Sequence, residues 1–264
     1  KQVGQQVVLN PLISCGICSD CRSGRSNICA HRKLIGMNFS GAFAEFITIQ
    51  EHNMIPIPEG MNPVHAALTE PAATSLHALH LAERALHRPV SEGRALVIGG
   101  GSVGLLAALL LRSHGCSEIM LCDTNPLRRE TAFQTGCCEV FDPGQDADKL
   151  ENRFELVIDA VGMETTRQMA IRAVSSGGVM LHIGLQHGSG VCDFRKITLS
   201  EITVIGTYTY THIDLQAALQ SLYLGNLGDL TWVEERPLSE GSSAFSDLDI
   251  GSTAAPKIVL LLRG

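Results

Sequence analysis

The chain has 264 residues, of which 45% are hydrophobic and 18% charged, and its formal net charge is −7. This composition predicts a globular protein with one or two apolar cores. The acidic balance argues against nucleic acid or an anionic membrane as the main partner. No apolar run approaches the roughly 20 residues of a membrane-spanning helix, and no secretory signal opens the sequence. We therefore expect a cytoplasmic protein, and Lys1 in place of Met predicts a processed or partial sequence.

The first 60 residues are expected to be β-rich and irregular, because short apolar stretches alternate with glycines and prolines. Strands are expected at Val7–Leu9 and at residues 43–49, and an extended edge segment is expected at residues 54–58.

Four cysteines lie within this region in the pattern C-x2-C-x2-C-x7-C, at Cys15, Cys18, Cys21 and Cys29. Four thiolates in one short loop close a tetrahedral zinc site, and a site without an open position is structural. Bacterial ferredoxins bind iron–sulfur clusters through C-x2-C-x2-C-x3-C-P, whereas here the last gap is seven residues and no proline follows, so zinc is favoured. The remaining cysteines are expected to be small core residues: Cys116, Cys122, Cys137, Cys138 and Cys192.

From residue 63 the pattern becomes helical up to residue 87, and strands then alternate with helices. Nearly continuous apolar, β-branched runs between helices predict a parallel sheet covered on both faces, which is a doubly wound α/β fold. Strands are expected at residues 94–99, 118–122, 139–141, 154–161, 178–183 and 202–207, and helices at 102–114, 126–135 and 164–174. After residue 206 we expect a helix at 214–224, a Gly/Ser-rich stretch and a last strand at 257–262.

The first strand of this alternation leads into the pattern G-x-G-x-x-G, at Gly99, Gly101 and Gly104. The first glycine allows a tight turn, the second lets the backbone approach a pyrophosphate, and the third lets the helix pack against the strand. Ser102 and Val103 begin the helix, whose free N–H groups attract phosphate. The alternative is a glycine-rich turn without a ligand.

An acidic residue, Asp123, ends the next strand, about 20 residues further on, where it is expected to bind the ribose diol. A carboxylate there repels a 2′-phosphate, which favours NAD over NADP. Arg128 lies five residues later, within expected reach of the adenosine.

The four-cysteine loop, the Glu70-Pro71 helix and the glycine fingerprint together resemble the medium-chain, zinc-containing alcohol dehydrogenase family over essentially the whole chain. Glu70-Pro71 and Gly206-Thr207-Tyr208 resemble its polyol branch of sorbitol, idonate and threonine dehydrogenases. The resemblance implies a Rossmann domain plus a partial GroES-like, β-rich catalytic domain. The expected boundaries are 1–72 for the partial catalytic domain with its zinc lobe, 73–205 for the Rossmann domain and 206–264 for the return segment.

The resemblance also implies roles for particular residues. Glu70 matches a position at the catalytic zinc, and Thr74 one beside the nicotinamide. Val161 and Gly162 match the adenosine side, and the backbone of Ile183 and Gly184 matches the contact with the nicotinamide carboxamide. Read without the resemblance, Glu70 is equally an acid that stabilises a helix N-terminus. His77 and His80 are expected to be ordinary helix histidines, because no acidic pair lies near them in the sequence.

The implied reaction is zinc-dependent hydride transfer from a secondary alcohol, of polyol or sugar-acid type, to NAD, in a homo-dimer or homo-tetramer. Family members carry a Cys, a Gly-Thr/Ser-Asp and a Gly-His-Glu before the segment that starts here, and no residue of this chain matches them. The alternatives are a truncated, non-catalytic fragment that binds NAD and zinc, a zinc-free reductase, and a zinc-ribbon interaction module. The remaining motifs are intact, so we favour a truncated sequence of an ordinary enzyme.

Overall fold

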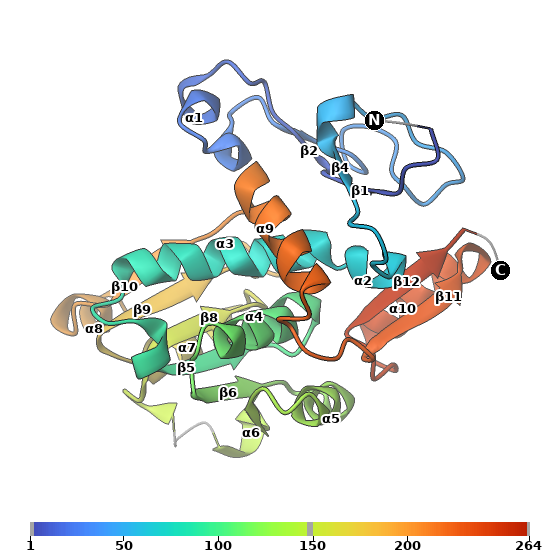
Figure 1. Ribbon diagram of the computed structural model, residues 1–264. Helices are drawn as coiled ribbons and strands as arrows, with labels where there is room; N and C mark the ends of the chain where they lie inside the picture. The colour runs from blue at the N-terminus through green and yellow to red at the C-terminus, as the bar shows by residue number, and fades with distance from the viewer. Residues whose placement is uncertain (1–2, 147–149, 263–264) are drawn as a thin grey trace.

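A six-stranded parallel sheet forms the centre of the computed structural model, which describes residues 3–146 and 150–262. The strands lie side by side in the order β10-β9-β8-β5-β6-β7, and every neighbouring pair is parallel (Figure 1). Numbered from β5, this is the strand order of the Rossmann fold. The strands are β5 (Arg94–Ile98), β6 (Glu118–Cys122), β7 (Glu139–Phe141), β8 (Phe154–Asp159), β9 (Val174–His182) and β10 (Thr203–Gly206).

Helices cover both faces of this sheet, as its apolar strands require. Along β5, Ala95 and Val97 belong to a core shared with α3, α4 and α9, whereas Leu96 and Ile98 belong to a core shared with α7. The alternation follows from the two-residue repeat of a strand. The helices are α3 (Thr69–Ala85), α4 (Ser102–Ser113), α5 (Pro126–Gln134), α6 (Pro143–Asp146), α7 (Glu164–Ala173), α8 (Phe194–Leu199) and α9 (His212–Tyr223).

The N-terminal part lies above α3 in Figure 1 and is mostly irregular. Two short antiparallel pairs organise it, β1 with β4 and β2 with β3. The expected strand at residues 43–49 is wrong, since those residues form bends and irregular backbone. Phe43 and Phe46 are exposed there, so no core face holds the segment in a sheet. The elements are β1 (Val7–Leu9), β2 (Leu12–Ile13), α1 (Ser19–Arg22), β3 (Lys33–Leu34), β4 (Met54–Pro56) and α2 (Pro63–Ala66).

The C-terminal part is more regular than its Gly/Ser-rich sequence predicts. Strand β11 (Val233–Pro237) pairs in parallel with β12 (Lys257–Leu261), and helix α10 (Gly241–Ile250) lies between them in sequence. This helix ends at Gly251, which has a φ of 70°, a conformation that glycine adopts without strain. Three side chains of the β6–α5 region bond to backbone oxygens of this part, so it lies against α5 and the turn before it.

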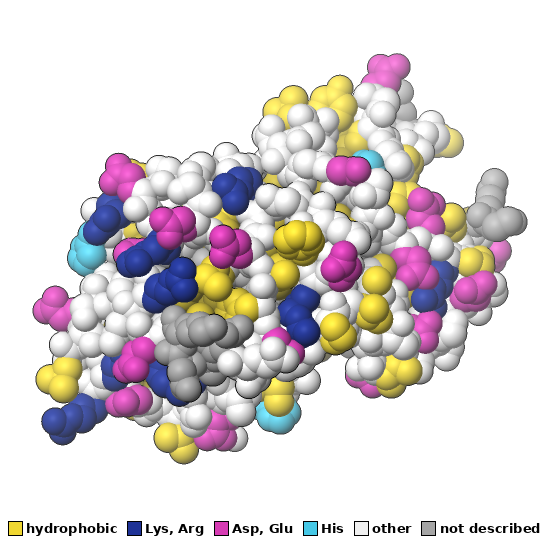
Figure 2. Space-filling model, turned by 90° about the horizontal axis from the view of Figure 1, so that it is seen from below, with side chains coloured by type: hydrophobic (Ala, Val, Ile, Leu, Met, Phe, Trp, Pro, Cys, Tyr) yellow, Lys and Arg dark blue, Asp and Glu magenta, His cyan; other side chains and the backbone are white. Residues whose placement is uncertain are grey.

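Most elements expected between residues 94 and 224 are present within one or two residues at each end, although β9 begins four residues earlier than expected. The strand expected at 154–161 ends at Asp159, because the next residues turn to bond with its side chain. Seen from below, acidic and basic side chains are interspersed over the surface (Figure 2). Among the described residues, no helix is both long and apolar enough to cross a membrane.

Candidate functional site

The four cysteine sulfurs of the N-terminal loop converge on one point. All four Sγ atoms lie within 4.8 Å of one another, with Cys15–Cys21 at 3.9 Å and Cys18–Cys29 at 3.8 Å. A tetrahedral zinc with Zn–S bonds of about 2.3 Å separates its sulfurs by about 3.8 Å, so the donor set fits zinc. Helix α1 brings this about, because Cys18 caps it and accepts a hydrogen bond from the backbone N–H of Cys21.

At Cys15 the loop favours the thiolate, the form that binds metal, whereas the pKa of the Cys18 thiol is raised to about 11. Backbone N–H groups, first that of Ile17 and then that of Cys18, lower the pKa of the Cys15 thiol to about 6. Arg25, which lies in the same loop, pairs with Asp20 at 2.6 Å. Outside the loop, Cys116, Cys122, Cys137 and Cys138 are buried and Cys192 is half-buried, as expected for core residues.

The predicted glycine fingerprint forms the turn between β5 and α4. Gly99 has a φ of 102°, which other residues rarely adopt, and a Cβ on Gly104 would overlap the carbonyl oxygen of Gly99. A Cβ on Gly101, by contrast, would meet nothing within 4 Å. Gly101 therefore borders open space at the N-terminus of a 12-residue helix, whose first turn contains Ser102 and Val103. This is the geometry in which backbone N–H groups and the helix dipole bind a pyrophosphate.

Asp123 lies beside this turn, at the end of β6, as the spacing predicts. It is 8% exposed, and its two carboxylate oxygens accept hydrogen bonds from the backbone N–H groups of Gly100 (2.7 Å) and Asn125 (2.7 Å). Each oxygen keeps a second lone pair for a ribose hydroxyl. Arg128 donates to the carbonyl oxygen of Leu248 at 3.1 Å, so the guanidinium contacts α10.

The ends of β8 and β9 meet at the residues expected to contact the cofactor. A Cβ on Gly162 would overlap the backbone of Gly184, and a Cβ on Gly184 would overlap that of Val161. Asp159 holds the two strand ends together. Its Oδ1 accepts from the N–H groups of residues 161 and 162, and its carbonyl oxygen accepts from those of Ile183 and residue 184. These glycines are thus required by packing, and their contact with a cofactor stays a prediction.

Helix α3 carries the other two predicted site residues. Thr74 Oγ1 donates to the carbonyl oxygen of Glu70 at 3.2 Å, and both side chains lie on one face of the helix. The next residue, Ser75, is fully buried and donates to the carbonyl oxygen of Val103 at 2.8 Å. This bond ties α3 to the first turn of α4, at the glycine loop.

The environment of Glu70 is more apolar than the sequence reveals. Burial raises the pKa of its carboxyl group, and Lys257 and a hydrogen bond from Tyr210 offset part of that rise. Lys257 and Tyr210 are 187 and 140 residues from Glu70, so no local pattern pointed to them. Tyr210 is 1% exposed, and burial raises the pKa of its hydroxyl strongly.

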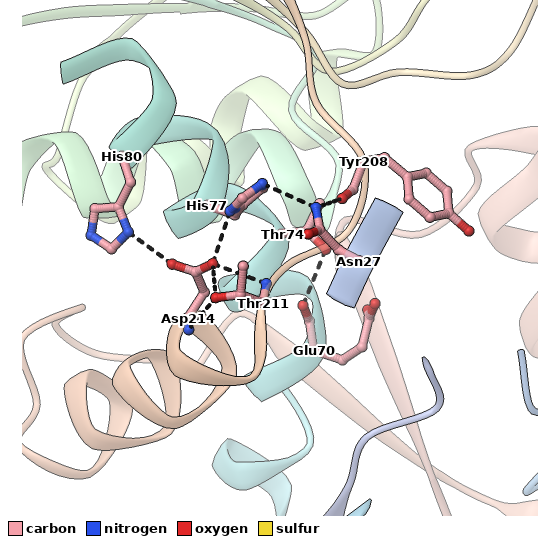
Figure 3. A network of polar contacts seen from close by, with 8 residues as sticks. All are labelled: Asn27, Glu70, Thr74, His77, His80, Tyr208, Thr211 and Asp214. Carbon is pink, nitrogen blue, oxygen red and sulfur yellow. Dashed lines mark hydrogen bonds and ion pairs between the residues drawn. The ribbon is translucent and has the colours of Figure 1, made fainter. Parts of the chain in front are cut away.

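His77 and His80 are not ordinary helix histidines, which corrects the expectation from the sequence. Both rings bond to one carboxylate, that of Asp214 on α9, with Nδ1–oxygen distances of 2.8 Å each (Figure 3). Asp214 is 5% exposed and also accepts from the backbone N–H and hydroxyl of Thr211. The acid was missed because it lies 134 residues beyond His80.

Comparison with known proteins agrees with this geometry. The family model of the alcohol dehydrogenase GroES-like domain matches residues 1–59, and that of the zinc-binding dehydrogenase matches residues 102–223. L-galactonate-5-dehydrogenase of Escherichia coli is 32% identical over 218 residues, which cover 80% of this chain and 62% of that protein. The chain belongs to the zinc-containing medium-chain alcohol dehydrogenase family.

Two further relatives support this family assignment. D-altritol 5-dehydrogenase of Agrobacterium fabrum is 33% identical over 185 residues, which cover 70% of this chain and 54% of that protein. The alcohol dehydrogenase of Thermus sp. has a similar structure, with a TM-score of 0.89 and 26% identity over 99% of this chain and 79% of that one. The chain thus spans 62% and 54% of the length of the two curated relatives.

Proposed function

We propose that the protein is an oxidoreductase that transfers a hydride from a secondary alcohol of a polyol or sugar acid to NAD. One observation carries the proposal. The hydrogen bond from Ser75 to the carbonyl oxygen of Val103 fixes the helix that bears Glu70 and Thr74 against the glycine loop. The proposed alcohol site on α3 and the proposed dinucleotide site at α4 would therefore be joined by this hydrogen bond.

The described residues fit NAD. The open side of Gly101 and the N-terminus of α4, with Ser102 and Val103, would hold the pyrophosphate. Asp123 would accept from the adenosine ribose and exclude a 2′-phosphate. The backbone of Ile183 and Gly184 would contact the nicotinamide end, and Thr74 would pack beside it. When bound, NAD⁺ would supply the hydride acceptor, and the chain's own residues would bind, orient and shield the reacting groups.

Two more expected contacts in this cleft are part of the proposal. Val161 and Arg128 would lie on the adenosine side, where Val161 follows β8 and Arg128 lies on α5. Arg128 already bonds to Leu248, so in this arrangement it would also tie the cofactor edge to α10.

A catalytic zinc is a different matter, because such a site needs three protein ligands and an open position. Among the described residues, Glu70 is the one predicted ligand, and the cysteine loop is the one group of three or more metal-binding side chains. The described residues alone therefore do not form a catalytic zinc site. The sulfurs of Cys15, Cys18, Cys21 and Cys29 would hold a structural zinc.

The substrate class rests on two supports. The two curated relatives are named for oxidation of a sugar acid, galactonate, and of a polyol, altritol. The Glu70-Pro71 pair and Tyr208 of this chain resemble the same branch of the family. We infer a small, hydroxyl-rich substrate with a secondary alcohol.

We further propose domain boundaries at 1–72, 73–205 and 206–264, the cytoplasm as the compartment and a homo-dimer or homo-tetramer as the assembly. All nine cysteines are free in the structure, which agrees with a reducing compartment. Strand β10 is the last strand of its sheet, and its exposed Thr203 and Val204 leave an edge that a second copy can cover. The interspersed charges of Figure 2 do not favour a nucleic-acid partner.

Calorimetric titration with NAD⁺ and NADP⁺, together with metal analysis, tests the proposal. We expect NAD⁺ to bind, NADP⁺ to bind more weakly by about tenfold or more, and zinc to be present in the cysteine loop. Oxidation of a panel of polyols and sugar acids then tests the reaction. Binding of NAD⁺ with about one zinc per chain and no turnover of any polyol would favour a non-catalytic fragment instead. Absence of both NAD⁺ binding and zinc would refute the proposal.

A further inference from the structure

The cysteine loop makes two contacts with a segment almost 180 residues away, and both start within three residues of Cys29. Asn27, 4% exposed, lies in the short 3-10 turn Ser26–Ile28 and donates from Nδ2 to the carbonyl oxygen of Tyr208 at 3.0 Å. Arg32 lies over the Tyr208 ring at 4.5 Å and bonds through Nη1 to the carbonyl oxygen of Cys29. The loop thus contacts both the backbone and the ring of Tyr208.

The same amide of Asn27 reaches α3. Its Nδ2 lies 3.3 Å from Nε2 of His77, whose Nδ1 lies 2.8 Å from Asp214. An ionised carboxylate only accepts, so Nδ1–H of His77 donates to Asp214 and Nε2 accepts from Asn27. Each donor in this series of hydrogen bonds has an acceptor, and the order of the bonds fixes the tautomer of His77.

The series of hydrogen bonds continues into α9 and returns to the 207–211 segment, to which Asn27 also bonds. Asp214 is the third residue of α9 and forms a capping box with Thr211, which ends the 207–211 segment. Within this segment Thr209 has a φ of 48°, a conformation that costs a β-branched residue energy, and surrounding contacts must maintain it. We call Asn27, His77, His80, Thr211 and Asp214 the clasp (Figure 3).

The clasp lies on the face of α3 that bears the predicted site. Residues 70, 74 and 77 are four and three positions apart, which places Glu70, Thr74 and His77 along one side of the helix (Figure 3). Partly buried hydrogen bonds therefore connect the cysteine loop to this face and to the 207–211 segment.

We propose that the cysteine loop is a positioning device: through Asn27 and Arg32, metal binding at its four thiolates sets the packing of α9 and the 207–211 segment on the Glu70 face of α3. The inference rests on the zinc site of the proposed function. Asn27 is a positioning residue in it, because it acts through His77 and Tyr208 and touches no reacting group.

Hydrogen exchange read by mass spectrometry tests this coupling on the full chain, before and after zinc removal by a chelator. We expect removal to speed exchange about fivefold or more at the amides of residues 211–216, as well as within the loop. Asn27→Ala with zinc bound should already show the faster exchange at 211–216, and chelation should add little. Asn38→Ala is the matched control, since Asn38 lies in the same lobe and its side chain accepts a local hydrogen bond from the N–H of Leu34.

Arg32→Met is a second variant, which keeps the side-chain length but loses the charge over Tyr208, and we expect a smaller rise at 207–211. If zinc removal changes exchange only within residues 15–38, or if Asn27→Ala behaves like Asn38→Ala, the coupling is refuted while the zinc site stands. A chain that binds no zinc in metal analysis refutes the zinc site itself, and the coupling with it.

Discussion

The glycine loop between β5 and α4 and the clasp between α3 and α9 each gather a few polar groups, but over very different lengths of chain. The glycine loop is complete within residues 99–104 and gains one partner, Asp123, from the adjacent strand. The clasp joins residues 27, 77, 80, 211 and 214, which come from three separate segments. A local loop is defined by backbone geometry, which glycines report, whereas the clasp depends on how helices pack.

The difference extends to the forces involved. In the glycine loop the groups proposed to bind the pyrophosphate are backbone N–H groups, so the side chains matter mainly where they are absent. In the clasp the side chains are the structure, and one buried carboxylate satisfies two imidazoles and a helix cap. The glycine loop therefore tolerates many residue types at its positions other than the glycines. The clasp loses several hydrogen bonds when its one shared acceptor, Asp214, is replaced.

The cysteine loop combines a local sequence motif with contacts to distant segments. Replacing one of its zinc-binding cysteines is expected to have the largest effect of the changes considered. Cys29 is fully buried, and Cys29→Ser should abolish tight zinc binding and unfold the loop, because a structural zinc contributes roughly 10 kcal/mol to such sites. Metal analysis and thermal unfolding measure this. Cys192→Ser, which changes a half-buried cysteine outside the loop, should keep the zinc and shift stability by no more than about 1 kcal/mol. Equal zinc contents in the two variants would contradict the assignment of Cys29 as a ligand.

The glycine loop gives the next effect. Gly101 has extended backbone with a φ of −70°, and a Cβ there meets nothing within 4 Å, so Gly101→Ala should fold normally. The methyl group would occupy the space proposed for the pyrophosphate and should weaken NAD⁺ binding by about tenfold or more. Gly188→Ala is the control, because that glycine also borders open space but lies outside the loop. Unchanged NAD⁺ affinity in Gly101→Ala would show that the dinucleotide does not lie over this turn.

These two regions also show how far the sequence leads. The fold, the zinc donor set and the glycine turn follow from local patterns, since periodicity and short spacings report backbone geometry directly. The strand expected at residues 43–49 failed because Phe43 and Phe46, although they are strand-favouring residue types, are exposed and have no core to pack against. Beta propensity without a packing partner does not form a sheet.

The partners of His77, His80 and Glu70 were beyond reach for a different reason. Asp214, Tyr210 and Lys257 approach them only after the chain has passed through the whole sheet. No pattern within α3 distinguishes a histidine that faces solvent from one that faces a carboxylate on another helix. A weak signal did exist, since Thr211 and Asp214 have capping-box spacing at the start of a helix.

Removing the contact between the glycine loop and α3 should have a smaller effect than changing the cysteine loop or the glycine loop. Ser75→Ala removes the hydroxyl that donates to the carbonyl oxygens of Val103 and Pro71, and should cost about 1 kcal/mol of unfolding free energy. Urea unfolding measures it. Ser243→Ala removes an exposed hydroxyl that bonds only locally, and should change stability by about 0.5 kcal/mol or less. The idea that α3 and α4 are fastened by this bond fails if both variants are equally stable.

The smallest expected effect is the pH dependence of the clasp. Burial opposes ionisation of Asp214, but hydrogen bonds from His77, His80 and Thr211 outweigh it and hold the pKa of its carboxyl well below the usual range. The hydrogen bond to Asp214 is also the main cause that raises the pKa of His80, with Glu83 adding to the rise and burial opposing it. The ring of His114, which directly follows α4, lies 6.5 Å from the ring of His80. The positive charge of Arg84 lowers the pKa of His80 slightly.

The two shifts define a window of stability. The lowered carboxyl pKa contributes stability at pH values above the unfolded pKa of about 4, and this stability is lost as the pH falls through the folded pKa. The raised histidine pKa contributes stability at pH values below the unfolded pKa of about 6.5, and this stability is lost as the pH rises through the folded pKa. The clasp is therefore strongest between these limits. Asp214→Asn should lower the melting temperature most between about pH 4 and 6.5 and less at pH 8, with a difference between the two ranges of about 2 °C. Asp229→Asn, at an exposed acid that caps a local turn, should show no such window. A constant offset between Asp214→Asn and the unmodified chain from pH 5 to 8 would contradict the charge interaction between Asp214 and His80.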